Sequence, residues 1–167
     1  MLVIPKLSKD KFACKRCPDC CFFRKEEEMP LIFYWEKEEL EKIAEERGLK
    51  LSFKNFLVVE TPQEEFVYIY RWIINGKCPF LNGVDCTIHN RKPLSCRMFP
   101  LVVEIPKNRV YLSLRCRWVR EHIRELSPAD LPYVFEEIEI AAKVIGMVND
   151  FLRIAKENGW KIRTETT

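Results

Sequence analysis

The chain has 167 residues, which is enough for one domain with its own hydrophobic core, and no linker or internal repeat divides it. Its formal net charge of +3 is mild, so charge alone indicates no nucleic-acid partner. No apolar run approaches the roughly 20 residues of a membrane span. We therefore expect residues 1–167 to form a single domain that does not cross a membrane.

The first residues, Met1 to Lys6, lack the apolar stretch and the cleavage site of a signal peptide, which predicts a cytoplasmic protein. Charged residues make up 32% of the chain, with lysine and glutamate dominant, and this balance is typical of a thermophile. In a reducing compartment, eight cysteines favour metal or redox chemistry over a disulfide framework. The disulfide framework stays open as an alternative, because the cytoplasm of hyperthermophiles does hold disulfides.

The first half of the chain contains one predicted helix and one predicted strand. Apolar residues at helical spacing predict a short helix near 36–47, and Gly48 supplies its stop. Residues 66–74 are aromatic and β-branched, which is typical of a strand. A pair of strands fits within 101–114, so we expect a small antiparallel sheet drawn from these segments.

The C-terminal third predicts a long helix from about 130 to 158. Capping residues and a proline suited to a first turn stand at 127–130, and Gly159 follows the helix. Its apolar stripe is made of Val134, Ile138, Ala141, Ala142, Ile145, Val148 and Leu152. The predicted fold class is α+β: a small single domain with a small antiparallel sheet, cysteine-rich metal-binding loops and a long C-terminal helix.

Two-residue gaps separate Cys14, Cys17 and Cys20, and Cys21 follows directly. Such gaps let a tight turn aim successive sulfurs at one point, as at zinc and iron–sulfur sites. The first three cysteines have the spacing of bacterial ferredoxin ligands, but the fourth cysteine of that pattern is missing. Because adjacent residues project in different directions, we expect Cys20 and Cys21 not to serve one metal equally.

The other four cysteines are spread over predicted loops and strand ends. They are Cys78, Cys86, Cys96 and Cys116. The two groups of four cysteines could form two four-thiolate sites, or one centre could take ligands from both groups. Their spacing leaves both arrangements open. Because the first group needs a further ligand, we expect the loop at 14–21 to fold back against 78–96. All eight cysteines are candidate metal ligands.

The cysteine motif continues through Cys78-Pro79-Phe80-Leu81 and Cys86-Thr87-Ile88-His89 to Lys92-Pro93-Leu94-Ser95-Cys96-Arg97-Met98-Phe99-Pro100. The ordered motif from Cys14 to Pro100 resembles the YkgJ-type cysteine-cluster family of zinc- or iron-chelating domains. A related cysteine pattern occurs in flagellin lysine-N-methylase. The resemblance implies metal chelation and, in the methylase-like branch, an iron–sulfur cluster.

The chain departs from the family pattern at two positions. His89 stands where the family usually has tyrosine, and Lys92 stands where it usually has arginine. Neither change removes a cysteine. A role that the family's tyrosine and arginine have in holding a substrate, however, is not assigned to His89 and Lys92. The resemblance does not extend to residues 117–167, and Cys116 lies beyond the motif.

Arg97 directly follows Cys96 and is a candidate cofactor-binding residue, since its guanidinium group can donate hydrogen bonds to cluster sulfurs or hold an anionic substrate. A structural arginine that closes the loop is the alternative. His89 is a weaker ligand candidate, because eight thiols are already available. Arginines are dense in the same part of the chain: Arg97, Arg109, Arg115, Arg117, Arg120 and Arg124. Interleaved glutamates favour a salt-bridged solvated face over a nucleic-acid interface.

The leading functional hypothesis is a metal-binding protein whose thiolates hold an iron–sulfur cluster, of the 4Fe-4S type, in an electron-transfer or cluster-assisted role. The alternative is a zinc-binding module without catalytic activity, whose metal organises a surface for a protein partner. A methylase-like enzyme that acts on a protein lysine ranks third. The sequence contains no Walker loop, dinucleotide fingerprint or nucleophile elbow, and it leaves open whether the protein is an enzyme.

Overall fold

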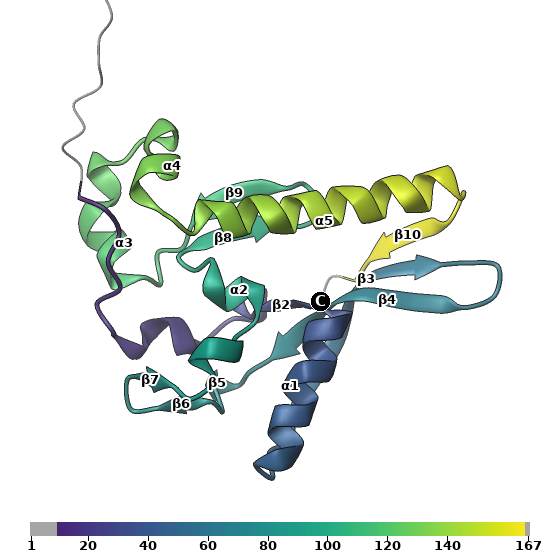
Figure 1. The fold of residues 1–167 in the computed structure, drawn as a ribbon, viewed down its shortest axis with the longest axis horizontal. Helices are drawn as coiled ribbons and strands as arrows, with labels where there is room; N and C mark the ends of the chain where they lie inside the picture. Colours follow the sequence, from purple (N-terminus) through teal and green to yellow (C-terminus); the bar gives the residue numbers. More distant parts are fainter. Residues whose placement is uncertain (1–9, 166–167) are drawn as a thin grey trace, which may run out of the picture.

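The computed structural model describes residues 10–165, which form a mixed arrangement of helices and antiparallel strands (Figure 1). The largest sheet has four antiparallel strands in the order β10-β3-β4-β2. These strands are β2 (Leu31–Phe33), β3 (Ser52–Glu60), β4 (Glu65–Ile73) and β10 (Lys161–Thr164). The α+β class expected from the sequence is confirmed.

Helix α1 (Tyr34–Glu46) follows β2 directly and confirms the short helix expected near 36–47. Glu36 caps its start, because the carboxylate accepts a hydrogen bond from the backbone N–H of Phe33 at 3.0 Å. The chain leaves the helix at Gly48, whose φ of +66° is a left-handed conformation that glycine adopts without strain.

Helix α5 (Ile138–Glu157) is the expected long C-terminal helix, but it begins later than the predicted start near residue 130. The preceding residues form two separate short elements, η5 (Pro128–Asp130) and α4 (Leu131–Val134). Between α4 and α5 the backbone becomes extended at Phe135, whose ring is fully buried against two other aromatic rings. Burial of this ring outweighs the local helical pattern. The apolar stripe predicted as one helix therefore belongs to two separate helices, α4 and α5.

Three further sheets have two strands each. Their strands are β1 (Phe22–Phe23) with β5 (Gly76–Lys77), β6 (Leu81–Asn82) with β7 (Asp85–Cys86), and β8 (Leu101–Glu104) with β9 (Arg109–Leu112). The sequence predicts that 66–74 and 101–114 share one sheet, whereas the structure places β4 in the large sheet and β8–β9 in a hairpin of their own. Strand β3, the main partner of β4, was not predicted.

Several short helices connect these strands and carry part of the cysteine motif. They are η1 (Pro18–Cys21), η2 (Glu26–Glu28), η3 (His89–Arg91), α2 (Leu94–Arg97), α3 (Arg117–His122) and η4 (Ile123–Glu125). Four cysteines stand in loops, as the sequence predicts (Cys14, Cys17, Cys78 and Cys116), whereas Cys20, Cys21 and Cys96 stand in short helices and Cys86 in β7. Figure 1 shows η1, α2 and the small strands β5–β7 close together on the side of the molecule opposite the tip of the β3–β4 hairpin.

Two groups of buried side chains form the core. The first lies under α5 and includes Val144, Leu101 and Trp118, together with Cys116. The second lies beside α1 and includes Leu40, Trp72, Phe80 and Cys78, with Cys21 and Cys86 packed against it. Four of the eight cysteines are therefore divided between the two cores.

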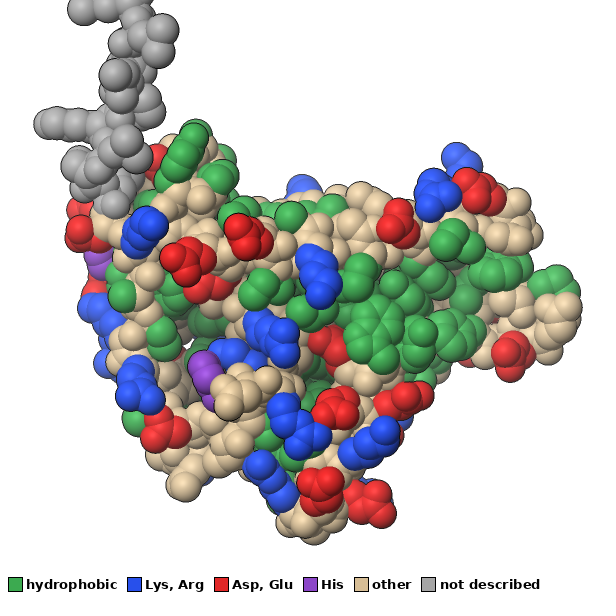
Figure 2. Space-filling model, viewed as in Figure 1, with side chains coloured by type: hydrophobic (Ala, Val, Ile, Leu, Met, Phe, Trp, Pro, Cys, Tyr) green, Lys and Arg blue, Asp and Glu red, His purple; other side chains and the backbone are tan. Residues whose placement is uncertain are grey.

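On the face that Figure 2 shows, hydrophobic side chains gather between α5 and the β3–β4 hairpin. Aromatic stacking joins the two elements there, with Tyr68 and Phe151 at a ring-centroid distance of 3.9 Å. Within residues 10–165, no helix is long and apolar enough to cross a membrane.

Candidate metal centre

The start of the cysteine motif folds back onto the middle of the chain. Phe22 of β1 pairs with Lys77 of β5, and the backbone N–H of Cys78 donates to the carbonyl oxygen of Cys21 at 2.7 Å. This pairing places η1, which carries Cys20 and Cys21, beside the second cysteine segment. The structure thus brings together the two segments that the sequence analysis expected to meet.

Five cysteines line one cleft of about 1250 Å³. They are Cys20 and Cys21 on η1, Cys78 after β5, Cys86 at the end of β7 and Cys96 on α2. The Sγ atoms of Cys20 and Cys21 lie 3.8 Å apart, so both neighbours reach the same cleft. Both cysteines stand in η1, a 3₁₀ turn that starts at Pro18; that they do not serve one metal equally stays a prediction. We call these residues the five-thiol group.

The thiols of this group act on one another electrostatically. The hydrogen bond with Cys21 is the main reason why the pKa of Cys20 is raised, and burial adds to it. Burial raises the pKa of Cys78 to about 11. Burial also raises the pKa of Cys96, and the charges of Cys78, Cys86 and Cys20 raise it further. These three thiols therefore favour their protonated forms in the absence of a metal.

Among the basic side chains that line the cleft, Lys92 and Arg115 act on Cys20 through their positive charge, which lowers its pKa against the effects of the hydrogen bond with Cys21 and of burial. Arg115 donates from Nη2 to the carbonyl oxygen of Cys20 at 2.6 Å and from Nη1 to that of Glu28 at 3.1 Å. Its guanidinium group also lies over the ring of Phe23, at 4.3 Å from the centroid. Burial lowers the pKa of Arg115, whereas the nearby negative groups of Glu28, Cys20, Cys96 and Cys21 act in the opposite direction.

The remaining cysteines, Cys14, Cys17 and Cys116, do not line this cleft. Burial raises the pKa of Cys116, and the charges of Cys17 and Cys14 add to that effect. We call these residues the three-thiol group. The spacing of Cys14, Cys17 and Cys20 predicts that they act together; in the structure Cys20 lines the cleft, whereas Cys14 and Cys17 do not.

Arg97, the candidate cofactor-binding residue, is exposed and does not line the cleft. Its Nε donates to the carbonyl oxygen of Lys92 at 2.9 Å, which closes the loop before α2. His89 is also exposed and outside the cleft lining. Arg115, predicted to lie on a solvated face, lines the cleft instead, and its position next to Cys116 is the sequence signal for this.

All eight cysteines are free thiols. In the part of the chain that the structure describes, no three His, Cys, Asp or Glu side chains stand in the geometry of a bound metal ion. The thiols therefore do not have the positions of ligands around a bound ion.

Comparison with known proteins gives a family for this arrangement. Residues 13–124 match the family model described as "CxxCxxCC: Putative zinc- or iron-chelating domain". The chain belongs to the CxxCxxCC family. The cysteine run that gives the family its name is Cys14 to Cys21 here. No curated protein and no solved structure shows significant similarity to the chain.

The family match corrects one expectation from the sequence. The resemblance was expected to end near Pro100, whereas the match continues to residue 124 and includes Cys116 and all of α3. All eight cysteines of this CxxCxxCC protein thus lie within the matched region. Membership in the family makes it a metal-binding protein for zinc or iron.

Proposed function

We propose that the five-thiol group binds an iron–sulfur cluster of the 4Fe-4S type. The observation that carries the proposal is the convergence of five thiols, from η1, β5, β7 and α2, on one cleft. A 4Fe-4S cluster needs four cysteine thiolates, so the group supplies enough ligands within one cleft. The fifth thiol then stands beside the cluster, where it can donate or accept a hydrogen bond.

The charges around the cleft support the same proposal. Four thiolates in a partly buried site need positive groups nearby, because uncompensated buried charge is costly. Arg115 and Lys92 supply that charge. Moreover, the Nε atom of Arg115 is buried and has no hydrogen-bond partner among the described residues. A cluster sulfur is an acceptor that could satisfy this N–H group.

A bound cluster would supply one-electron transfer. Residues of this chain would then hold it, neutralise its charge and limit the access of water. The cleft extends beyond the thiols along apolar walls that include Phe56, Leu101 and Val103. Three large hydrophobic side chains of its lining are exposed: Phe22, Tyr111 and Leu114. We propose that these side chains contact the protein or small molecule with which electrons are exchanged, or on which the cluster acts.

A zinc-binding module is the second candidate, because the family description names zinc beside iron. Four of the five thiols would then hold one tetrahedral ion, and the ion would order the segments that meet in the cleft for a protein partner. The methylase-like role has weaker support, since it rests on the resemblance of the cysteine pattern alone.

The decisive experiment is metal and sulfide analysis of protein purified without oxygen, together with its visible spectrum. We expect iron, acid-labile sulfide and a broad visible absorption. Cys96→Ser should lower the iron content, whereas Ser95→Ala, its neighbour in the same cleft, should not. Colourless wild-type protein that contains zinc but neither iron nor sulfide would replace the first proposal by the second.

A further inference from the structure

A second cavity, of about 250 Å³, lies between α1, α2 and α5. Lys92, Pro93 and Leu94 line both this cavity and the cleft, so the segment that leads into α2 separates the two. Four basic and two acidic side chains line the second cavity, and we call it the basic pocket. They are Arg91, Lys92, Arg97 and Lys143, with Glu36 and Glu39. Among the described residues, no cysteine lines it.

The two carboxylates of the basic pocket already have partners. Glu39 accepts a hydrogen bond from Nε of Arg91 at 3.0 Å and forms an ion pair with the same guanidinium group. Glu36 accepts the backbone N–H of Leu94 on one oxygen and that of Phe33 on the other. Arg91 is therefore neutralised by Glu39, and backbone groups occupy both oxygens of Glu36.

The other three basic side chains share the pocket without an ion pair. In the part of the chain that the structure describes, no carboxylate lies within 4 Å of the charged nitrogens of Lys92, Arg97 or Lys143. Arg97 donates from Nε to the carbonyl oxygen of Lys92 at 2.9 Å, and this bond leaves its two terminal NH₂ groups available. Burial raises the pKa of Glu36, whereas the charges of Arg97 and Lys143 lower it. Both cations therefore act on one carboxylate of the pocket.

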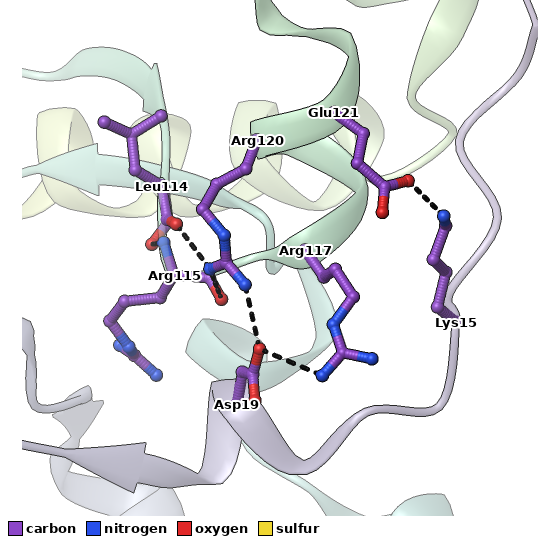
Figure 3. A network of polar contacts seen from close by, with 8 residues as sticks. Lys15, Asp19, Leu114, Arg115, Arg117, Arg120 and Glu121 are labelled. Carbon is purple, nitrogen blue, oxygen red and sulfur yellow. Dashed lines mark hydrogen bonds and ion pairs between the residues drawn. The ribbon is translucent and has the colours of Figure 1, made fainter.

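A network elsewhere in the chain shows how cations from distant segments are compensated. Asp19 accepts from Arg120 at 3.0 Å and pairs with Arg117 at 3.8 Å (Figure 3). Lys15 pairs with Glu121 in the same region. A carboxylate placed between cations reduces their mutual repulsion. In the basic pocket, an anion from solution would have the place that Asp19 has in this network.

The charge and size of the basic pocket favour a small dianion. Glu39 offsets Arg91, and Glu36 offsets one of the three other cations, so a charge of +2 is left. The volume of about 250 Å³ lies below the range of about 300–1,000 Å³ that is typical for drug-sized ligands. A phosphate ester carries close to two negative charges near neutral pH and has three acceptor oxygens. A guanidinium group such as that of Arg97 binds phosphate through two parallel hydrogen bonds.

Trp35 gives the basic pocket one apolar wall. Its ring stacks on that of Phe33 at a centroid distance of 4.6 Å, which fixes its orientation, and 37% of the residue is exposed. An aromatic ring held in this way offers a flat surface to an apolar or planar group. The pocket therefore combines positive charge with a contact surface for the organic part of an ester.

We propose that the basic pocket binds a small phosphomonoester. Arg97 and Lys143 bind the phosphate oxygens, and Lys92 adds positive charge beside them. Trp35 packs against the organic group of the ester. Lys143 lies beyond residues 13–124, the region that the family model matches, so metal chelation does not account for this site.

Isothermal titration calorimetry of the full chain with phenyl phosphate and with inorganic phosphate tests the proposal. The ionic strength is held constant because salt screens exposed charges, and at about pH 7.5 the ester is mainly a dianion. We expect one saturable site in wild type and tighter binding of phenyl phosphate than of inorganic phosphate. Lys143→Gln and Arg97→Gln should each weaken binding about tenfold, since each removes a charged hydrogen-bond donor. Lys143 is exposed and makes no ion pair with a described residue, so its variant keeps the fold.

Lys156→Gln is the matched control, because Lys156 is exposed on the same helix, α5, and does not line the basic pocket. It should bind phenyl phosphate as wild type does, and Lys143→Gln should keep the wild-type metal content. Equal affinity of wild type and Lys143→Gln would overturn the site, and so would equal weakening in Lys156→Gln. Binding of inorganic phosphate without binding of phenyl phosphate would overturn the ester as ligand. Colourless, iron-free protein would contradict only the proposed cluster, since these titrations do not depend on the thiols.

Discussion

Arg115 and Cys20 are joined by a hydrogen bond of 2.6 Å, from the guanidinium Nη2 to the backbone carbonyl oxygen, although 95 residues separate them. This contact ties Arg115, which precedes the N-cap residue of α3, to η1. Arg115 also reaches the carbonyl oxygen of Glu28. One side chain therefore fixes the turn that presents Cys20 and Cys21, and it carries positive charge into the wall of the cleft.

Arg115→Met should weaken both metal retention and the fold. The methionine keeps much of the apolar contact with Phe23 but loses two hydrogen bonds to carbonyl oxygens and the positive charge. We expect a loss of about 1–3 kcal/mol in the free energy of unfolding, together with a lower iron or zinc content. Urea unfolding and metal analysis measure the two effects.

Arg124→Met is the matched control for this prediction, because Arg124 is exposed on η4 and does not line the cleft. It should leave metal content and the urea midpoint within error of wild type. Equal metal content in the two variants would show that the charge of Arg115 is not needed at the site.

The pKa of Cys78 predicts how the metal-free protein responds to pH. Burial raises this pKa from an ordinary value of 9.0 to about 11, so folding favours the neutral thiol. The contribution to stability is therefore full below about pH 9 and is lost as the pH rises toward 11. Urea midpoints of metal-free wild type should fall across that window. Cys78→Ala should show a smaller fall, and an identical fall would contradict the assignment.

Metal binding should have the opposite dependence on pH. Thiols protonated at neutral pH must release their protons when a metal binds, so affinity rises as pH rises. Each proton released contributes up to about tenfold in affinity per pH unit. Competition with a zinc chelator at pH 6.5, 7.5 and 8.5, after correction for protonation of the chelator, measures the slope. A flat profile would show that the ligands are already thiolates before the metal arrives.

The sequence predicted those parts of the fold in which local pattern and packing agree. Helix α1 and most of α5 have apolar residues at helical spacing, and glycine follows each helix at Gly48 and Gly159. Strand β3 escaped prediction because a register shift near Phe56 interrupts its alternation, so that four consecutive residues of the strand are buried. Its assignment depends on pairing with β4, which is not a local property.

The division of the cysteines could not be predicted from their spacing. Equal gaps separate Cys14, Cys17 and Cys20, yet Cys17 precedes η1 as its N-cap residue and Cys20 lies within it. Pro18, which starts the turn, was the local signal that the chain changes direction there. The position of the chain before and after this turn depends on the pairing of β1 with β5 and on the ion pairs to α3. Both interactions join segments that are distant in the sequence.

Gly146→Ala should stabilise the protein. Gly146 lies inside α5 on its exposed side, and a methyl group added there meets no atom within 4 Å. Alanine favours the helix over glycine by about 0.5–1 kcal/mol. Gly159→Ala is the matched comparison, because its φ of +68° is strained for alanine, and it should lower stability instead. Thermal midpoints of the two variants should therefore move in opposite directions, and a shift of both in one direction would contradict the helix boundaries.

Glu36→Ala should loosen α2, the helix that carries Cys96, from α1. One carboxylate oxygen of Glu36 accepts the backbone N–H of Leu94 at 2.7 Å, and the other accepts the N–H of Phe33 at 3.0 Å. Burial raises the pKa of Glu36, and these two hydrogen bonds act against that rise. Alanine leaves both N–H groups without this acceptor, which should cost about 1–3 kcal/mol. Hydrogen exchange at the amide of Leu94 should accelerate more than exchange in α5.

Glu39→Ala removes a carboxylate one turn further along α1 and provides the control. Glu39 is paired with Arg91 at the surface, and exposed pairs of this kind contribute about 0–1 kcal/mol. Exchange at Leu94 should therefore stay at the wild-type rate in this variant. If Glu36→Ala accelerates exchange at Leu94 and also lowers bound metal, then the position of Cys96 depends on α1. Acceleration without a change in metal content would show that the metal itself holds α2 in place, since metal binding and local folding are then coupled at that helix.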